Sequence, residues 1–220
     1  MSVNIYMDYM SQPSRAILAY CLAAEIPHKV VEIRLAKLAH KDSEFLKINP
    51  FGKVPAIEDQ GFTLFESHAI LTYLANKHAK TDSFYPKDLK KRALIDAYLH
   101  WHHLNTRRCA LLFQASNPQF FPGMKLPSVE SETKAVKRIL KTLEDVFLKD
   151  GKYLCGQDSI SIADISAACE IAQLYMTNYD LNQHTKLKEW LDRCLAHPAM
   201  KEAHKVFFKV LGKIKPNPKL

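Results

Sequence analysis

Short apolar runs and helical periodicity alternate along the first third of this chain. Runs rich in β-branched residues predict strands, whereas apolar residues that recur every three or four positions predict helices with one buried face. The predicted strands cover residues 3–7, 29–35, 54–59 and 62–67, and the predicted helices cover residues 13–25, 38–49 and 67–79. In chain order this is a βαβαββα arrangement, in which Gln60-Gly61 marks a hairpin and Ser67 caps the last helix.

After residue 79 the strand pattern stops. Residues 80–87 are polar and contain one proline, so we interpret them as a linker. Apolar residues then recur at helical spacing in five segments, at 89–113, 129–151, 161–176, 186–197 and 199–213. The segment at 161–176 is apolar on almost every side, which predicts a buried central helix. The sequence thus predicts an α/β domain at 1–79, the linker at 80–87 and an all-helical domain at 88–220.

Composition and charge narrow the class of protein. The 220 residues are 47% hydrophobic and 25% charged, which is ordinary for a globular chain with a sizeable core. The 31 basic and 23 acidic residues give a net charge of +8, and such an excess can serve nucleic-acid binding. Here the basic residues are scattered and no aromatic side chains interleave with them, so we expect a solvated surface and no nucleic-acid partner. No apolar run approaches the roughly 20 residues that span a bilayer, so no membrane span is expected.

Cysteine usage and the first residues predict a compartment. The five cysteines are an odd number, lie far apart and include no C-x-x-C pair. That pattern favours free thiols in a reducing compartment over a disulfide framework or a zinc site. The first ten residues lack the basic and long apolar regions of a signal peptide. We therefore expect a cytoplasmic protein.

Three short motifs can carry chemistry. Ser11 precedes a proline at the start of a predicted helix, where free N–H groups attract an anion. Ser11 therefore either only caps this helix or also hydrogen-bonds a thiolate. In NPFGKVPAI, Pro55 forms either an edge or a bulge, or a cis bond that leaves the Val54 backbone free for an extended peptide. In FESHAIL, Glu66 and Ser67 either hold the two charged ends of an amino acid or are a surface residue and a plain cap.

A fourth feature invites a metal interpretation. Asp96, His100, His103 and Arg107 share one stripe of the predicted helix at 89–113, at a spacing that could hold zinc. Arg107 on that stripe would repel a cation, and no cysteine joins the set. We therefore expect no metal site and favour a polar stripe that faces a cleft or a partner.

The order of these motifs on the predicted elements resembles the cytosolic glutathione transferases of the serine-type theta class. The similar motifs are SQPSRA, NPFGKVPAI, TLFESHAI, DAYLHWHHLNTRR and SISIADI, which together extend over essentially the whole chain. The resemblance implies a thioredoxin-like N-terminal domain that binds glutathione and an all-α C-terminal domain that binds the electrophile. It also implies a homodimer.

The resemblance further implies roles for individual residues. Ser11 would donate a hydrogen bond to the glutathione sulfur, a task that a tyrosine performs in other classes, and Tyr9 is the nearest rival hydroxyl. Glu66 and Ser67 would bind the γ-glutamyl end of glutathione. The other implied contacts are His40 and Lys41 at the glycine end, Lys53 and the Val54 backbone along the peptide beside a cis Pro55, and Arg107 facing the site.

Two further positions complete this comparison. Ser161 and Asp164 would form a structural capping box at the start of the buried helix. Theta-like relatives often carry an acidic or polar side chain where this chain has Leu104, so their glutathione contact across the dimer is not carried over.

The implied activity is conjugation of the glutathione thiolate, with no metal, to small hydrophobic electrophiles such as alkyl halides or epoxides, and reduction of hydroperoxides. One alternative is a non-catalytic glutathione-binding or protein-interaction module on the same fold, which the intact Ser11, Glu66 and Ser67 disfavour. Another is a thiol reductase, which is disfavoured because Cys21 lies inside a predicted helix and not at its N-terminus.

Overall fold

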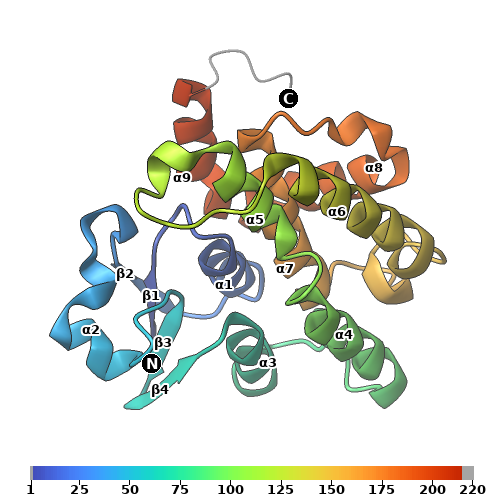
Figure 1. The fold of residues 1–220 in the computed structure, drawn as a ribbon. Coiled ribbons are helices and arrows are strands. Elements are labelled where there is room, and N and C mark those ends of the chain that lie inside the picture. The colour runs from blue at the N-terminus through green and yellow to red at the C-terminus, as the bar shows by residue number, and fades with distance from the viewer. Residues whose placement is uncertain (1, 215–220) are drawn as a thin grey trace.

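The N-terminal part of the chain is built on one mixed sheet, and Figure 1 shows it beside a larger group of helices. The structure is a computed structural model that describes residues 2–214. The four strands are β1 (Val3–Met7), β2 (His28–Glu32), β3 (Ala56–Asp59) and β4 (Phe62–Phe65), in the spatial order β2-β1-β3-β4. β1 and β2 are parallel, and the other two pairs are antiparallel. Gln60 and Gly61 both have positive φ, as a two-residue hairpin requires, so the predicted hairpin is confirmed.

Helices cover both faces of this sheet. They are α1 (Gln12–Ala23), α2 (Ser43–Ile48) and α3 (Ser67–Lys77), with two short 3₁₀ turns, η1 (Leu35–Lys37) and η2 (Ala39–Lys41), before α2. Side chains alternate between the two faces of a strand. Ile5 of β1 therefore joins the core beneath α1 and α3, whereas Tyr6 packs against Phe45 of α2. The predicted βαβαββα order is confirmed, although the helix expected at 38–49 is shorter, because its first residues form the 3₁₀ turn η2 and the α-helix begins only at Ser43.

The C-terminal part is all helical. Its α-helices are α4 (Leu89–His102), α5 (Arg108–Ser116), α6 (Val129–Thr142), α7 (Ile162–Ile171), α8 (Thr185–Ala196) and α9 (Pro198–Ile214). Every residue of α7 is buried, which confirms the predicted central helix. None of the helices within residues 2–214 is both long and apolar enough to cross a bilayer.

The buried start of α7 is closed by a capping box. The Ser161 N–H donates to Asp164 Oδ2 at 2.9 Å, and the Asp164 N–H donates to Ser161 Oγ at 3.5 Å. The other carboxylate oxygen, Oδ1, accepts from the Leu154 N–H at 2.7 Å and from the Trp190 indole at 2.8 Å. Both oxygens of a fully buried carboxylate are thus satisfied, and this lets the helix begin inside the core.

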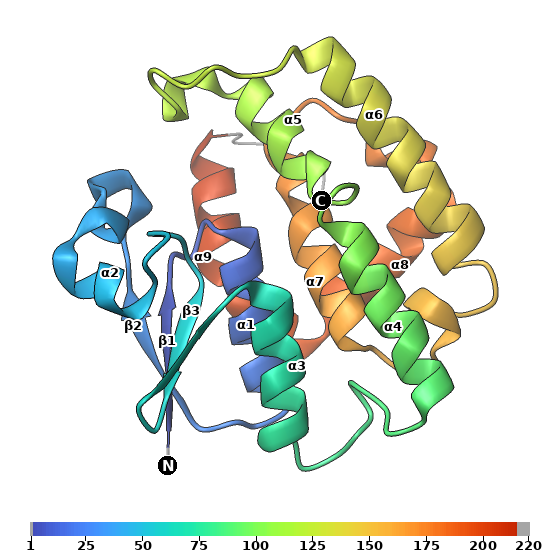
Figure 2. The same ribbon diagram turned by 60° about the horizontal axis from the view of Figure 1, so that its bottom comes forward.

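α1 joins the two parts of the molecule. It lies between the sheet and α7 in Figure 2, and it packs against both α7 and α9. Arg15 of α1 is fully buried there, and it donates to the carbonyls of Tyr9 at 3.0 Å and Cys169 at 3.2 Å, and to Gln173 Oε1 at 3.1 Å. Its guanidinium lies 4.3 Å from the centre of the Phe207 ring. Burial lowers the pKa of Arg15 to about 10, so it remains charged at neutral pH.

The prediction of one continuous helix at 89–113 is wrong, because the helix is interrupted between His102 and Arg108. In this turn the Arg107 N–H bonds the His102 carbonyl and the Arg108 N–H bonds the Asn105 carbonyl, in place of the carbonyls four residues back. The Asn105 side chain donates to the Trp101 carbonyl at 2.8 Å, which is the local competition with backbone bonding that makes asparagine a poor interior helix residue. The predicted stripe of Asp96, His100, His103 and Arg107 therefore does not continue to Arg107.

Asp59 holds the end of α3 against the sheet. Its side chain is only 1% exposed and accepts from His78 at 2.6 Å, from Tyr73 at 2.8 Å and from Lys77 at 3.1 Å. Burial alone would raise the pKa of this carboxyl, but the hydrogen bonds from His78, Tyr73 and Lys77 reverse that effect and lower its pKa to about 2. The carboxylate therefore stabilises the fold while it is ionised.

Replacing Asp59→Asn is expected to lower the free energy of unfolding by about 1.5–3 kcal/mol at pH 7, because it removes the charge from a buried hydrogen-bonded network. The unfolded pKa is about 3.9 and the folded pKa about 2. The stabilisation is thus complete above the unfolded pKa and is lost as pH falls through the folded one. Urea unfolding of both proteins between pH 6 and pH 2 measures the difference, which should shrink towards zero at the acid end.

Asp192→Asn is the matched control, since Asp192 also pairs with a lysine, Lys188, but is 54% exposed. It should cost less than about 1 kcal/mol. Equal losses in the two variants, or a loss in Asp59→Asn that does not change with pH, would contradict this account.

Candidate functional site

A cavity of about 190 Å³ lies where the sheet domain meets the helices. Its walls come from the loop before β3, from the start of α3, and from α4, the turn before α5, and α7. The residues implied by the sequence that line it are Lys53, Val54, Pro55, Glu66, Ser67 and Arg107. Segments more than 100 residues apart in the chain thus meet in one site.

The loop at 49–55 is fixed by its own hydrogen bonds. Asn49 is buried, donates from Nδ2 to the Lys53 carbonyl at 2.7 Å, and accepts the Phe51 N–H at 3.0 Å. The Val54–Pro55 peptide bond is cis, which is one of the possibilities that the sequence left open beside an edge or a bulge. Asn49 also lines the cavity, which the sequence does not predict, because an asparagine before a proline indicates only the end of a helix.

Gly52 lets this loop touch the turn that carries His40 and Lys41. Its φ is +57°, and a Cβ built on it would lie 2.7 Å from the His40 carbonyl oxygen and 3.3 Å from the Leu46 side chain. His40 and Lys41 are thus held beside the loop but do not line the cavity. Burial and the nearby Lys41 lower the pKa of His40, so its ring is neutral at pH 7.

The N-cap of α3 lies one residue earlier than the sequence predicts. Glu66 is the N-cap, with a φ of +70°, and Ser67 is the first helical residue and not the predicted cap. Neither side chain caps the helix in the described structure, which leaves the Ser67 hydroxyl and the first N–H groups of α3 at the cavity wall. This end of the helix favours an anion, and Glu66 beside it favours a cation.

Three histidines pack together beside the cavity. His68 Nε2 lies 2.7 Å from Ser166 Oγ, and its ring centre lies 4.8 Å from that of His102 and 4.6 Å from that of His103. Burial, followed by His102 and His103, lowers the pKa of His68 to about 2, so this imidazole is neutral. Within residues 2–214, histidine, cysteine and acidic side chains form no group of three or more that could hold a metal ion.

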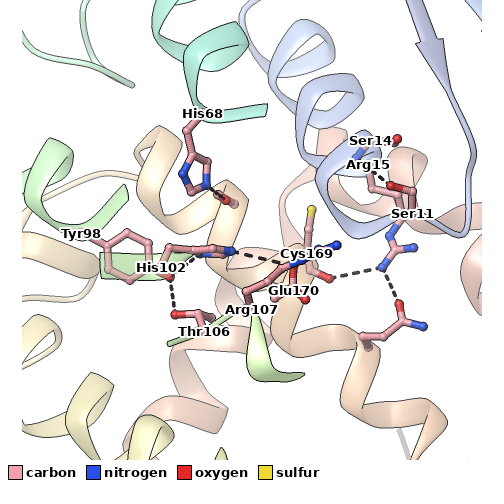
Figure 3. A network of polar contacts seen from close by, with 12 residues as sticks. Ser11, Ser14, Arg15, His68, Tyr98, His102, Thr106, Arg107, Cys169 and Glu170 are labelled. Atoms are coloured by element: carbon pink, nitrogen blue, oxygen red, sulfur yellow. Dashed lines mark hydrogen bonds and ion pairs between the residues drawn. The ribbon is translucent and has the colours of Figure 1, made fainter. Parts of the chain in front are cut away.

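Arg107 and Glu170 form the polar wall opposite α3. Arg107 Nη1 donates to Glu170 Oε2 at 2.7 Å, and His102 Nε2 lies 3.8 Å from the same oxygen (Figure 3). Burial alone would raise the pKa of Glu170, but Arg107 and His102 hold it below its usual range. No local spacing relates α3 to α4 and α7, so the sequence does not predict the other lining residues of these helices, which are Glu170, His68, His102 and Ser166.

Ser11 is the N-cap of α1, close to the cavity but not part of its lining. Its Oγ accepts the Ser14 N–H at 3.4 Å, and the residue is 8% exposed. The interpretation of Ser11 as a helix cap is therefore confirmed. Pro13 in the first turn of the same helix does line the cavity, so the start of α1 lies at its edge. A hydroxyl that accepts one bond still has a proton to donate.

All five cysteines are free and buried. Burial raises the pKa of Cys21 to about 12, and it also raises those of the other four thiols. None of them is a ready thiolate, so the site does not offer a cysteine nucleophile of its own.

Two family models match the chain. The model described as "Glutathione S-transferase, N-terminal domain" matches residues 2–76, and that described as "Glutathione S-transferase, C-terminal domain" matches residues 107–198. The two matches fall on the sheet part and on the helical part of the fold.

Similar curated proteins extend over almost all of the chain. Glutathione S-transferase T1 of Arabidopsis thaliana is 41% identical, covering 96% of this chain and 91% of the relative. Glutathione S-transferase theta-1 of Mus musculus is 37% identical, covering 96% and 90%. Glutathione S-transferase T2 of Arabidopsis thaliana is 40% identical, but the chain spans only 37% of that longer protein.

A solved structure shares the architecture. The human theta-class glutathione transferase in complex with the glutathione conjugate of 1-menaphthyl sulfate superposes with a TM-score of 0.88 at 32% identity. The superposition covers 98% of this chain and 91% of that chain.

Gly52→Ala is expected to destabilise the protein more than Gly61→Ala. Both residues have positive φ, so an added Cβ costs each about 1–2 kcal/mol. Only at Gly52 does the new Cβ also meet the His40 carbonyl, which adds about 1–3 kcal/mol, since Gly61 has open space around it. Urea unfolding of the two variants tests this, and equal losses would show that the contact between loop 49–55 and the His40 turn is loose.

Proposed function

The chain belongs to the glutathione S-transferase family, and from this premise we propose that its cavity holds glutathione as a thiolate for transfer to small apolar electrophiles. The observation that carries the proposal is the pairing of opposite charges around the start of α3. Glu66 lies beside Ser67 and the free N–H groups, with Arg107 on the facing wall. An α-amino acid end group, with one ammonium and one carboxylate, is the ligand that such a wall fits.

In this proposal the γ-glutamyl end of glutathione lies deepest. Its ammonium contacts Glu66, and its carboxylate contacts Ser67, the first N–H groups of α3 and Arg107. The cysteinyl backbone runs along Val54 as an added strand would, beside Lys53. The glycine carboxylate points outward, towards His40 and Lys41. This orientation is supported by the lining of the cavity, to which all of these residues except His40 and Lys41 belong, and by the Gly52 turn, which holds His40 and Lys41 beside it.

The sulfur then lies near the start of α1. A free thiol has a pKa of about 8.5. A hydrogen bond from Ser11 to the charged sulfur contributes about 1.5–3 kcal/mol, and the helix terminus adds about 0.3–1 kcal/mol. At about 1.36 kcal/mol per pKa unit, together they lower the thiol pKa by roughly one to three units. That is enough to make thiolate the main form at pH 7.

The thiolate is the nucleophile of the transfer, and Ser11 is a donor only. The thiol proton leaves to solvent, a sulfur–carbon bond forms, and an alkyl halide loses its halide with the electron pair of the broken bond. An epoxide instead opens to an alkoxide that takes a proton from water. Small apolar electrophiles of these kinds are our proposal for the helical part of the cavity, and reduction of hydroperoxides by the same thiolate is a further expectation.

Assembly, domain boundaries and compartment follow as expectations of the same proposal. We expect a homodimer in the cytoplasm, with domains at 1–79 and 88–220 joined by the linker 80–87. Leu104 supports an apolar contact between subunits, because it is 83% exposed in the turn between α4 and α5. Chromatography with light scattering tests the dimer, and a purely monomeric protein would overturn that part.

Ser11→Ala is expected to reduce kcat/KM for conjugation by about 10- to 100-fold and to raise the pKa of bound glutathione, because the sulfur loses one charged hydrogen bond. The ultraviolet absorbance of the thiolate against pH measures the pKa. A panel of alkyl halides, epoxides, hydroperoxides and aryl halides measures turnover. Wild-type protein that binds glutathione but turns over no member of the panel would favour the non-catalytic module.

Two variants control this experiment. Ser128→Ala removes the N-cap of α6, where Ser128 accepts the Ser131 N–H at 3.1 Å, so it should cost about 1 kcal/mol of stability and no activity. Tyr9→Phe should keep both the activity and the thiol pKa. Near-normal turnover in Ser11→Ala together with an inactive Tyr9→Phe would transfer the role to Tyr9.

A further inference from the structure

We propose that Glu170 is a positioning residue for glutathione binding, which acts by holding the Arg107 guanidinium at the cavity wall. The inference rests on the proposed function, since it takes glutathione to be the ligand of this cavity. It adds a residue from the central helix α7 to a site whose other contacts come from the sheet domain and from the turn before α5.

The geometry of the ion pair is the first support. Arg107 Nη1 lies 2.7 Å from Glu170 Oε2 (Figure 3), and both residues line the cavity. The Arg107 side chain is 42% exposed, whereas that of Glu170 is 2% exposed. A long, half-exposed arginine loses considerable rotamer entropy when a ligand fixes it. A buried carboxylate that fixes it beforehand removes that cost from binding.

The second support is that Glu170 itself is held firmly. It lies in α7, all of whose residues are buried. His102 Nε2 is 3.8 Å from the same carboxylate oxygen, and His102 Nδ1 lies 3.2 Å from the Tyr98 hydroxyl. That hydroxyl in turn lies 3.1 Å from Thr106 Oγ1, in the turn that precedes Arg107. The chain of contacts therefore returns to the side chain of Thr106, the residue directly before Arg107, so one network ties Glu170 to the turn that carries Arg107.

The neighbouring residue provides a matched comparison within the same turn. Arg108 pairs with Glu132 Oε1 at 2.5 Å, and the Glu132 side chain is 3% exposed. In each of these glutamates the second carboxylate oxygen is buried without a hydrogen-bond partner in the described structure. The two pairs thus share residue types and burial, but neither Arg108 nor Glu132 lines the cavity. A role in stability alone would affect both pairs, whereas a role in binding belongs to the Arg107 pair.

The experiment compares Glu170→Gln with Glu132→Gln in the full-length protein by titration calorimetry. Glu170→Gln should weaken glutathione binding by about five- to tenfold, the range of a directly coupled contact, while Glu132→Gln stays within twofold of wild type. An analogue without the α-carboxylate of the γ-glutamyl residue should bind wild type and Glu170→Gln equally, because Arg107 then has nothing to contact. Urea unfolding records the stability of both variants.

The Arg107→Ala variant completes a double-mutant cycle. Adding Glu170→Gln to Arg107→Ala should cause no further loss of glutathione affinity, since the positioned group is already absent. If Glu170→Gln does not fold, Glu170→Asp keeps the charge but withdraws it by one methylene. It should show a smaller loss that again disappears with the analogue.

The inference is overturned by wild-type affinity in Glu170→Gln, by an equal loss for glutathione and for the analogue, or by additive losses in the cycle. Failure of the proposed function looks different, because wild-type protein would then bind no glutathione at all. Equal losses of affinity in Glu170→Gln and Glu132→Gln would assign both pairs to the fold alone.

Discussion

The geometry of this site depends on the hydrogen bonds that the buried guanidinium of Arg15 donates. It reaches from α1 to the carbonyl of Cys169 at 3.2 Å and back to the carbonyl of Tyr9 at 3.0 Å. Tyr9 lies two residues before Ser11, and Cys169 is the neighbour of Glu170. One side chain therefore ties the segment that presents the Ser11 hydroxyl to the turn of α7 that presents the Glu170 carboxylate. Because its hydrogen-bond partners are all neutral, the charge stabilises the contact between α1 and α7 through directed hydrogen bonds and through the Phe207 ring.

The cavity beside this contact carries side chains of both charges, each at a fixed position in its wall. Carboxylates stand at Glu66 and Glu170 and cations at Lys53 and Arg107, and the pKa of His68 is lowered to about 2, so its imidazole adds no charge. The buried Glu170 stays ionised because Arg107 and His102 face it. A wall of this kind selects among ligands by where their charges lie more than by their net charge. This suits a ligand whose ammonium and carboxylate are close together.

The sequence predicts those features of the structure that arise between residues close together in the chain. The hairpin at Gln60-Gly61 and the capping box of Ser161 and Asp164 are short-range features, and the structure confirms both. The break after His102 was not predicted, because apolar periodicity continues through it while Asn105 competes for backbone bonds. The site is formed by residues that lie far apart in the chain. Lys53 and Arg107 were indicated as glutathione contacts by the resemblance to the glutathione transferases and not by periodicity. The contacts of His68 with Ser166 and of Arg107 with Glu170 cross 98 and 63 residues and leave no trace in spacing.

The two interpretations of Ser11, a cap or a donor, turn out to be compatible. As a cap, its oxygen accepts the Ser14 N–H, and this draws electron density away from the hydroxyl. Such a hydroxyl is a stronger donor through its own proton, because hydrogen bonds in a chain polarise one another. The acceptor bond also orients the oxygen at the helix start, where the dipole is positive. A capping serine at this place is therefore better suited to a thiolate than an isolated one, so the sequence signal for the structural role is also the signal for the chemical role that we propose.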